Sequence, residues 1–355
     1  MKVAVAMSGG VDSSVAAALL KDEGHEVTGV TMRLFSSGDS KSNGNLPDSV
    51  EKAGEVAGKL GIPHHIIDLT DFFHDKVITD FCREYSRGRT PNPCITCNRY
   101  IKFEALMEKA VELGADSLAT GHYARVEKDA QTGKYLLKKG TDTTKDQSYF
   151  LYRLLQEQLA GTRFPVGSMT KDRVKRMAGE MNLPVADRPE SQEICFIPGG
   201  KYIEFLENNL PEPARPGPII SESGENLGEH RGIYSYTIGQ RRGTGIASAE
   251  PLYVTAIEPE RNIVVVGPRE SIYSNELTAY NLNWISGEVP ELPGRLKARI
   301  RYRHPEAEAT ITPEDNNTVR VVFAEPQMAI TPGQSVVFYD GDTVIGGGII
   351  QKSGK

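Results

Sequence analysis

The segment Ser8-Gly9-Gly10-Val11-Asp12-Ser13 combines glycines, hydroxyls and one carboxylate directly after a short apolar run. Glycines let the backbone approach phosphate oxygens, and a helix beginning here would add unpaired N–H groups and its positive dipole end. The hydroxyls of Ser8, Ser13 and Ser14 supply further donors, whereas Asp12 could cap the helix or hold Mg²⁺. The segment lacks the Gly-Lys-Ser/Thr ending of the common triphosphate loop and the spacing of the dinucleotide fingerprint. It therefore predicts a phosphate-binding turn of another class.

Widely separated cysteines are the second chemically informative set. Pro91 and Pro93 precede Cys94 and Cys97, and they predict a stiff, extended turn that presents both thiols. No second cysteine pair and no histidine pair with zinc spacing follows, so a complete structural zinc site is not expected. Cys195 is the third candidate thiol.

Cys82 differs from the other three cysteines, because it lies at helical spacing from Ile78 and Tyr85. This spacing predicts a cysteine that packs in the core. Four cysteines in 355 residues do not form a disulfide framework. In a reducing compartment, the close pair instead indicates metal, redox or sulfur chemistry.

Around these residues, short β-rich runs alternate with amphipathic stretches. The expected strands cover residues 2–7, 26–35, 64–69 and 117–126, and the expected helices cover 13–23, 48–60, 72–87 and 102–113, with a polar loop at 36–47. This alternation predicts an α/β fold with a parallel sheet and helices on both faces. Its ligand should lie beyond the carboxyl ends of the strands.

The pattern changes after about residue 200, where the proline-rich stretch 211–218 begins a region of short strands. A second change near residues 270–275 leaves a final all-β piece of about 80 residues, which is long enough for a small barrel. We therefore expect a nucleotide-binding catalytic domain at 1–203, a small, mostly-β central domain at 204–272, and a C-terminal β-barrel at 273–355.

Composition limits the classes of protein that the chain can represent. It is 39% apolar and 25% charged, with a net charge of -6. Any bound nucleic acid must therefore be held by local basic patches rather than by a global field. No run approaches the roughly 20 apolar residues of a membrane helix, and the N-terminus enters a strand without room for a signal peptide. A cytoplasmic location is expected.

Two basic segments are candidates for such patches. Residues 295–304 place five basic side chains at period two, which predicts one face of a strand. We favour a phosphate-tracking stripe there over an ordinary solvated face. Residues 171–176 form a basic helix capped by Thr170, where RNA contact and simple solvation are weighed equally.

Six ordered segments carry a resemblance to a known family: residues 8–13, 90–103, 120–125, 145–151, 191–196 and 236–243. Together they resemble the bacterial tRNA-specific 2-thiouridylases over nearly the whole chain. The resemblance implies a pyrophosphatase-loop nucleotide-binding domain of the adenine nucleotide alpha hydrolase type, followed by a central β domain and a barrel that contacts tRNA. It implies ATP and Mg²⁺ as cofactors. It also implies the anticodon stem-loop of tRNA and a sulfur-donor or sulfur-relay protein as partners.

The resemblance also implies a mechanism. ATP adenylates O2 of the wobble uridine, a persulfide on Cys195 attacks C2, and AMP leaves. Cys97 acts as the partner nucleophile and forms a disulfide with Cys195. Thiolates at neutral pH would require nearby cations, for which Arg89, Arg99 and Lys102 are candidates. The disulfide requires Cα atoms within roughly 4.4–6.8 Å, so we expect one loop to move when tRNA binds.

The family motifs imply two sets of binding residues. Those expected at the nucleotide are Ala6, Met7, Ser8, Gly9, Gly10, Val11, Asp12, Ser13, Met32 and Gly121. Those expected at the tRNA are Asn92, Pro93, Cys94, His122, Lys145, Asp146, Gln147, Arg301, Tyr302 and Gln334, with residues 240–242 on the same surface. For His122, the alternative is a turn histidine whose hydrogen bonds are satisfied within the protein.

Cys94 departs from the family pattern, in which an aspartate that could act as a general base occupies this position. A cysteine could replace it only with a lowered pKa. Cys94, Cys97 and Cys195 could instead hold a 4Fe–4S cluster with one open iron that delivers sulfide. The sequence favours neither the persulfide relay nor the cluster. Within the relay, one alternative is that Cys94 is a harmless substitution with no role in catalysis. Two competing functions are that of a nonenzymatic RNA-binding protein with a nucleotide fold and that of a metabolic ligase with the same loop.

Overall fold

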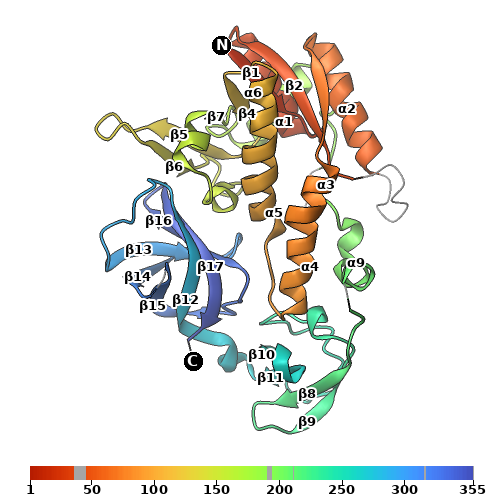
Figure 1. The fold of residues 1–355 in the computed structure, drawn as a ribbon, viewed down its shortest axis with the longest axis vertical. Coiled ribbons are helices and arrows are strands. Elements are labelled where there is room, and N and C mark those ends of the chain that lie inside the picture. Colours follow the sequence, from red (N-terminus) through yellow and green to blue (C-terminus); the bar gives the residue numbers. More distant parts are fainter. Residues whose placement is uncertain (36–44, 190–193, 211, 316, 355) are drawn as a thin grey trace.

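The computed structural model describes residues 1–35, 45–189, 194–210, 212–315 and 317–354 (Figure 1). Most of the expected loop at 36–47, and residues 191–193 of the cysteine motif, therefore lie outside the described residues. None of the described helices combines the length and the apolar character needed to cross a bilayer.

A five-stranded parallel sheet organises the N-terminal part of the chain, in the order β3-β2-β1-β4-β7. Its strands are β1 (Lys2–Ala6), β2 (Glu26–Arg33), β3 (His64–Asp68), β4 (Ser117–Ala119) and β7 (Thr162–Arg163). Val3, Ala4 and Val5 of β1 are all buried, as expected for a strand covered on both faces. The predicted α/β fold with a parallel sheet is confirmed.

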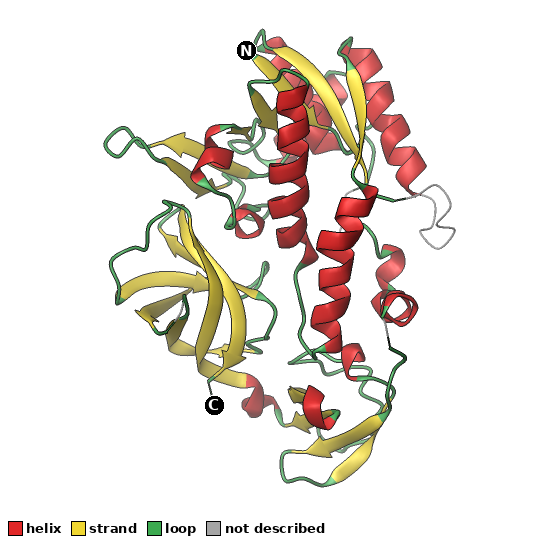
Figure 2. Cartoon of the chain, in the orientation of Figure 1, coloured by secondary structure: helices red, strands yellow, loops and turns green. Residues whose placement is uncertain are grey.

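Some of the helices lie against this sheet, and others, such as α9 (Tyr202–Asn209) beside α4 (Thr79–Ser86), lie away from it (Figure 1 and Figure 2). The purely α-helical elements are α1 (Val11–Asp22), α2 (Asn45–Leu60), α7 (Gln156–Ala160), α8 (Lys171–Glu180) and α9. Two composite helical segments each contain a π-helical stretch. The first joins α3 (Thr70–Phe73), η1 (His74–Ile78) and α4 (Thr79–Ser86), and the second joins α5 (Pro93–Thr96), η2 (Cys97–Ala105) and α6 (Leu106–Glu112).

The second composite helix corrects one prediction. The sequence predicted an extended turn around Cys94 and Cys97, but helical structure already begins at Pro93. Proline is well suited to the first helical position, where its missing N–H has no partner to lose. The Asn92 side chain accepts the Cys94 N–H at 3.2 Å and caps the helix. Cys94 therefore lies in the first helical turn, and Cys97 begins the π-helical stretch.

The single strand expected at 117–126 is also wrong, because the chain divides there into two strands of different sheets. β4 belongs to the parallel sheet, whereas β5 (Ala124–Lys128) pairs with β6 (Tyr135–Lys139). Between them the backbone of Gly121 packs on the phosphate turn, so closely that an added Cβ would lie 2.6 Å from the Ser13 nitrogen. The chain turns at this contact.

The remaining chain is mostly β, as predicted. A four-stranded sheet in the order β10-β11-β8-β9 contains β8 (Gly217–Ser221), β9 (Asn226–His230), β10 (Tyr253–Glu258) and β11 (Ile263–Gly267). A six-stranded barrel follows, closed by the pairing of β12 with β17, and contains β12 (Tyr273–Trp284), β13 (Gly294–Arg299), β14 (Ala307–Pro313), β15 (Val319–Met328), β16 (Ser335–Asp340) and β17 (Thr343–Ser353). Short 3-10 turns lie at Ser148–Leu151, Pro198–Gly200, Ile233–Ser235, Pro259–Arg261 and Arg269–Ile272.

The barrel and the N-terminal part share a sheet and a core. β17 pairs with β6, so the β5–β6 hairpin extends the barrel sheet (Figure 1). One buried cluster joins Phe103 and Tyr152 of the N-terminal part to Val337 and Tyr339 of the barrel. The parts that the sequence separates by composition are therefore packed against one another in the folded chain.

Candidate active site

The phosphate turn lies where β1 leads into α1. Gly9 has a φ of +67°, and a Cβ there would lie 2.3 Å from the Ser49 carbonyl oxygen, so glycine is required. The Ser8 N–H donates to Ser13 Oγ at 3.2 Å, and Ser14 Oγ donates to the Gly10 carbonyl at 2.8 Å. Gly10 is the N-cap of α1 and has no side chain to accept from the first helical N–H groups. The turn therefore directs a helix N-terminus toward the site, as an anion-binding turn requires.

The other predicted nucleotide residues lie at the same edge of the sheet. Ala6 pairs with Val30, two residues before Met32 on β2. Val5 pairs with Ala119, two residues before Gly121. The structure thus brings residues 6–13, Met32 and Gly121 to the carboxyl edge of three adjacent parallel strands.

Asp12 is held by two side chains from distant parts of the chain. Lys171 Nζ lies 2.6 Å from Asp12 Oδ1 and 2.8 Å from Oδ2. Tyr123 donates its hydroxyl to Oδ1 at 2.8 Å. Lys171 is only 6% exposed, so this residue does not belong to a solvated basic face of α8. The predicted Thr170 cap is confirmed, since its side chain accepts the Arg173 N–H at 3.3 Å.

Lys171 was missed as a site residue. Its one sequence signal is its position, because a cation in the first turn of a helix opposes the helix dipole. Arg188 was missed as well. It donates to the Gly9 carbonyl at 2.8 Å and to Asp48 at 2.9 Å, and so fixes the phosphate turn to α2. A cavity of about 240 Å³ adjoins this contact and is lined by Asp48, Lys52, Pro184, Val185, Asp187 and Arg188.

The three candidate thiols lie within electrostatic reach of one another. Cys97 is buried, whereas Cys94 and Cys195 keep exposed surface. Burial raises the pKa of Cys97 to about 11 and that of Cys195 to about 12, and it also raises the pKa of Cys94. Lys102 opposes all three shifts without overcoming them. The expected lowering of the thiol pKa is therefore wrong for this conformation.

The cations proposed near the thiols have different roles. Lys102 is close enough to the thiols for its charge to lower their pKa values. Arg89 instead lies 2.8 Å from the Glu84 carboxylate and donates to the Tyr280 hydroxyl at 3.0 Å. Arg99 lies over the Tyr100 ring, 4.8 Å from its centroid. Lys102 is therefore the candidate whose charge acts on the thiols.

In this conformation, Cys94, Cys97 and Cys195 are not grouped as ligands of a 4Fe–4S cluster would be. Within the described part of the chain, no three His, Cys, Asp or Glu side chains are grouped so that they could hold a metal ion. Cys82 packs in the core as predicted, with 4% exposure, and burial raises its pKa to about 11.

His122 lies in an aromatic environment. Its Nδ1 is 2.7 Å from Thr120 Oγ1, and its ring lies 5.9 Å from Phe103 and 5.8 Å from Phe164 between centroids. Burial, and then the charge of Lys102, hold the pKa of His122 well below its usual value. The imidazole is therefore neutral, and the geometry resembles the satisfied turn histidine more than an exposed RNA contact.

Several residues expected to contact tRNA instead form hydrogen bonds and ion pairs within the protein. Asp146 is 3% exposed and accepts the N–H groups of Gly140 and Ser148 at 3.1 Å, the Ser148 hydroxyl at 3.0 Å and Arg299 at 3.2 Å. Gln147 Oε1 accepts the Tyr123 N–H at 3.0 Å.

Two further members of that set, Tyr302 and Gln334, join the barrel to the N-terminal part. Tyr302 packs on Phe150, with ring centroids 4.3 Å apart. Gln334 donates to the Thr90 carbonyl at 2.7 Å, and Arg301 donates to the Met328 carbonyl at 3.3 Å. Lys145 is half-buried, Asn92 is the helix cap described above, and Pro93 is buried.

The predicted ten-residue basic strand is wrong in its second half. β13 ends at Arg299, and the His304 N–H closes a turn on the Arg301 carbonyl at 3.0 Å. Arg299 pairs with Glu306 at 2.6 Å as well as with Asp146, and Lys297 lies 3.9 Å from Glu308. Acids from neighbouring elements, which the local pattern could not reveal, thus neutralise part of the stripe.

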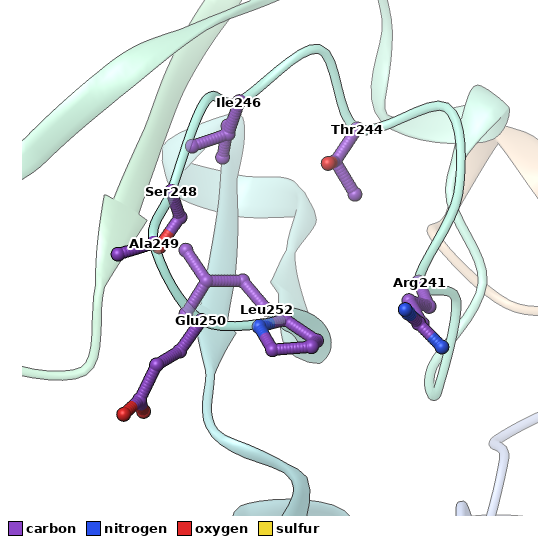
Figure 3. Close-up of a pocket in the computed structure, with 8 residues that line it drawn as sticks. Arg241, Thr244, Ile246, Ser248, Ala249, Glu250 and Leu252 are labelled. Atoms are coloured by element: carbon purple, nitrogen blue, oxygen red, sulfur yellow. The ribbon is translucent and has the colours of Figure 1, made fainter.

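The central sheet presents a separate surface pocket of about 240 Å³ (Figure 3). Its lining residues come from one loop: Arg241, Thr244, Ile246, Ser248, Ala249, Glu250, Pro251 and Leu252. Gln240 holds its own turn, since it accepts the Thr237 N–H and donates to the Arg242 carbonyl, each at 3.0 Å. Arg241 and Arg242 are exposed and form no ion pair with any described residue.

Comparison with known proteins gives a consistent result over the whole chain. Residues 1–199 match the family model "tRNA methyl transferase HUP domain", residues 203–268 the "tRNA methyl transferase PRC-barrel domain", and residues 274–350 the "Aminomethyltransferase beta-barrel domain". The chain is 50% identical to the tRNA-specific 2-thiouridylase MnmA of Acetivibrio thermocellus, covering 99% of both chains.

A second relative is tRNA-specific 2-thiouridylase MnmA 1 of Caldanaerobacter subterraneus, which is 52% identical over 99% of this chain and 98% of its own length. Among solved structures, a 4-thiouridine synthetase–RNA complex with bound ATP aligns with 59% of this chain and 50% of its own, at 18% identity and a TM-score of 0.37.

Proposed function

Because the chain belongs to the family of tRNA-specific 2-thiouridylases, we propose that it adenylates the wobble uridine of tRNA and transfers sulfur to C2 from a cysteine persulfide. The family activity makes the chain a sulfurtransferase that acts on tRNA. The adenylation step and the sulfur relay are the finer parts of the proposal.

One contact carries the proposal that activation and sulfur transfer share a site. Gly121 packs on the backbone of Asp12 and Ser13, at the phosphate turn. The next residue, His122, is influenced by Lys102, whose charge also acts on Cys94, Cys97 and Cys195. The phosphate turn and the thiols are thus linked through Gly121, His122 and Lys102. One bound tRNA uridine could therefore be activated at the turn and receive sulfur from the thiols.

In the first step, O2 of the uridine forms a bond to the α-phosphorus of ATP. The bond from that phosphorus to the α–β bridging oxygen breaks, and its electron pair leaves with pyrophosphate while the N3 proton is released. The turn at residues 8–13 supplies N–H and hydroxyl donors for the phosphates. If Mg²⁺ is bound with ATP, Asp12 is the one acidic residue of the turn that could contribute an oxygen to it, although Lys171 and Tyr123 bond that carboxylate in this structure.

In the second step, the terminal sulfur of a Cys195 persulfide forms a bond to C2. The Cys97 thiolate then attacks the inner sulfur and forms a Cys97–Cys195 disulfide, and the electron pair of the broken S–S bond stays on the transferred sulfur. The C2=S bond forms as AMP leaves. A thiol reductant later restores both cysteines. The relay uses two thiols, and no step passes through a metal cluster, for which the described residues offer no ligand group.

Product analysis tests the proposal. The full-length protein with ATP, unmodified tRNA and a persulfide donor should yield AMP, pyrophosphate and 2-thiouridine in equal amounts. Cys97→Ser and Cys195→Ser should still release pyrophosphate but form no 2-thiouridine, whereas Cys82→Ala, a control in the packed core, should form all three products. Absence of 2-thiouridine with a competent donor, under both aerobic and anaerobic conditions, would contradict the proposal. It would then favour a nonenzymatic RNA-binding protein or a small-molecule ligase.

A further inference from the structure

We infer that Lys171 binds the triphosphate of ATP and stabilises the departing pyrophosphate. The inference rests on the proposed function, because it assigns a residue to the adenylation step. It concerns a side chain that the sequence placed on a solvated or RNA-facing helix and that the structure turns inward.

The position of Lys171 is the first observation. Its ammonium group lies 2.6 Å from a carboxylate oxygen of Asp12, the second residue of α1. The N-terminus of α1 is where phosphate oxygens would meet the helix N–H groups and the phosphate turn. A phosphate bound at this turn is therefore within a few ångströms of the ammonium group.

The way Lys171 is built into the fold is the second observation. Asp142 accepts its backbone N–H at 2.9 Å, and the Thr170 cap fixes the start of α8. The side chain then runs inward to Asp12, near the Tyr123 ring, whose centroid lies 5.7 Å from Nζ. The hydrogen bond to Asp142 and the Thr170 cap thus fix the backbone at Lys171, whose buried side chain extends to the phosphate turn.

The energetics favour a role beyond structure. Burying an ammonium group costs several kcal/mol, and a buried ion pair seldom stabilises a fold more than apolar side chains of similar volume. The backbone position of Lys171, in the first turn of α8, is unfavourable for a cation as well. Both costs of placing the ammonium group here are offset when an anionic phosphate binds. A cation already in position then stabilises the negative charge that develops on pyrophosphate without reorganisation.

The competing explanation is that Lys171 only neutralises Asp12. A double-mutant cycle separates the two, since it measures the effect of Lys171→Gln with and without the Asp12 charge. The four full-length proteins are the wild type, Lys171→Gln, Asp12→Asn and the double variant. Arg176→Gln, an exposed cation on the same helix, serves as the matched control.

Calorimetric titration without tRNA gives the Kd for ATP and for AMP. We expect Lys171→Gln to weaken ATP binding at least tenfold, both in the otherwise wild-type protein and in the Asp12→Asn variant, and to change AMP binding less than twofold. Arg176→Gln should change neither. Thermal unfolding should show the double variant regaining stability lost in Lys171→Gln, although its ATP binding stays weak.

Either of two results would overturn the inference. One is ATP binding in the double variant equal to that in Asp12→Asn, which would reduce Lys171 to a counter-ion. The other is equal weakening of ATP and AMP. If the wild type itself fails to bind ATP, the proposed function fails and not merely the role of Lys171.

Discussion

At the scale of single residues, burial and the charge of Lys102 act in opposite directions on the pKa of the thiols. Burial raises the pKa of Cys97 and Cys195 well above neutrality, although Lys102 acts in the opposite direction. Both groups are protonated at pH 7 in this conformation. The proposed relay would therefore need a change that brings charge or solvent to the thiols, in keeping with the expectation of a loop that moves when tRNA binds.

The first prediction concerns the alkylation of Cys195, a residue that is exposed although its surroundings raise the pKa of its thiol. Because only the thiolate reacts and its pKa is about 12, the rate should rise about tenfold per pH unit, or roughly a hundredfold from pH 7 to pH 9. Mass spectrometry of the iodoacetamide-treated, tRNA-free protein measures this rate. Lys102→Gln should lower the rate further at each pH. A rate that levels off below pH 9 would show that the pKa is not raised.

The second prediction concerns Cys94. Because the proposed relay uses Cys97 and Cys195 alone, Cys94→Asp should keep 2-thiouridine formation within a few fold of the wild type, and protein purified anaerobically should contain no stoichiometric iron. Iron and sulfide assays alongside product analysis check both points. Bound iron that disappears in Cys94→Asp together with activity would restore the cluster alternative.

At the scale of elements, the segment before the cysteine helix is a junction of three parts of the molecule. The Thr90 N–H donates to the Pro332 carbonyl of the barrel at 2.9 Å, and Thr90 Oγ1 lies 3.2 Å from Thr237 Oγ1 beside the central sheet. Gly88 packs on Ile257 of β10, so closely that an added Cβ would lie 2.7 Å away. The helix that carries Cys94 and Cys97 is thus positioned by elements more than 100 residues away.

A third prediction follows for the barrel side of this junction. Gly333 has a φ of +91°, and an added Cβ would lie 2.9 Å from the Thr90 nitrogen. Gly333→Ala should therefore destabilise the protein by about 2–4 kcal/mol through strain and overlap, and it should reduce thiolation.

Gly341→Ala is the matched control, since its φ is +57° but no atom lies within 4 Å of the added Cβ. It should cost only about 1 kcal/mol and keep full activity. Chemical denaturation and product analysis compare the two variants, and equal effects would show that the contact with Thr90 is not important.

A fourth prediction concerns Arg89, which joins the end of α4 to the barrel. It lies 2.8 Å from Glu84 and donates to the Tyr280 hydroxyl and the Ile350 carbonyl. Arg89→Ala leaves the largely buried Glu84 without this partner, so we expect a loss of about 2–4 kcal/mol in the free energy of unfolding. Arg87→Ala removes an exposed partner of Glu84 at 3.9 Å and should cost less than about 1 kcal/mol. Comparable losses would contradict the assignment.

At the scale of the whole molecule, a net charge of -6 requires RNA to be held by local groups of cations. Arg241 and Arg242 are exposed on the central sheet, and neither forms an ion pair with another described residue. The basic residues of the barrel are instead partly neutralised, as Arg299 and Lys297 show. The central loop is therefore a stronger candidate for phosphate contact than the stripe that the sequence suggested.

The fifth prediction tests this difference through salt dependence. Arg241→Ala and Arg242→Ala should each weaken tRNA binding and reduce the slope of log Kd against log salt concentration by about one. Arg261→Ala should leave the slope unchanged, because Arg261 is paired with Glu258 at 2.8 Å. Filter binding over a range of salt concentrations measures the slopes, and unchanged slopes for both Arg241 and Arg242 variants would exclude them as phosphate contacts.

The sequence predicted what local patterns encode. The strands at 2–7 and 26–35, the helix expected at 13–23 and the packing of Cys82 follow from periodicity and glycine placement, and the structure confirms them, with the helix beginning two residues earlier at Val11. Contacts between distant residues could not be predicted in this way. Lys171 meets Asp12 across 159 positions, and Arg299 meets Asp146 across 153. The helix start at Pro93 was missed because proline was interpreted as a helix breaker rather than as a first-turn residue.

The pairing of β6 with β17 has a consequence for how the chain is made. Lys138 pairs with Thr343, so this edge of the hairpin has no partner until roughly 200 further residues have been synthesised. At about 5–20 residues per second, the wait on a ribosome lasts roughly 10–40 s. During that time the unpaired edge could pair with another nascent chain. Charged side chains at Lys138 and Lys139 would oppose such pairing, so the same hairpin that joins the barrel is suited to remain unpaired until the barrel arrives.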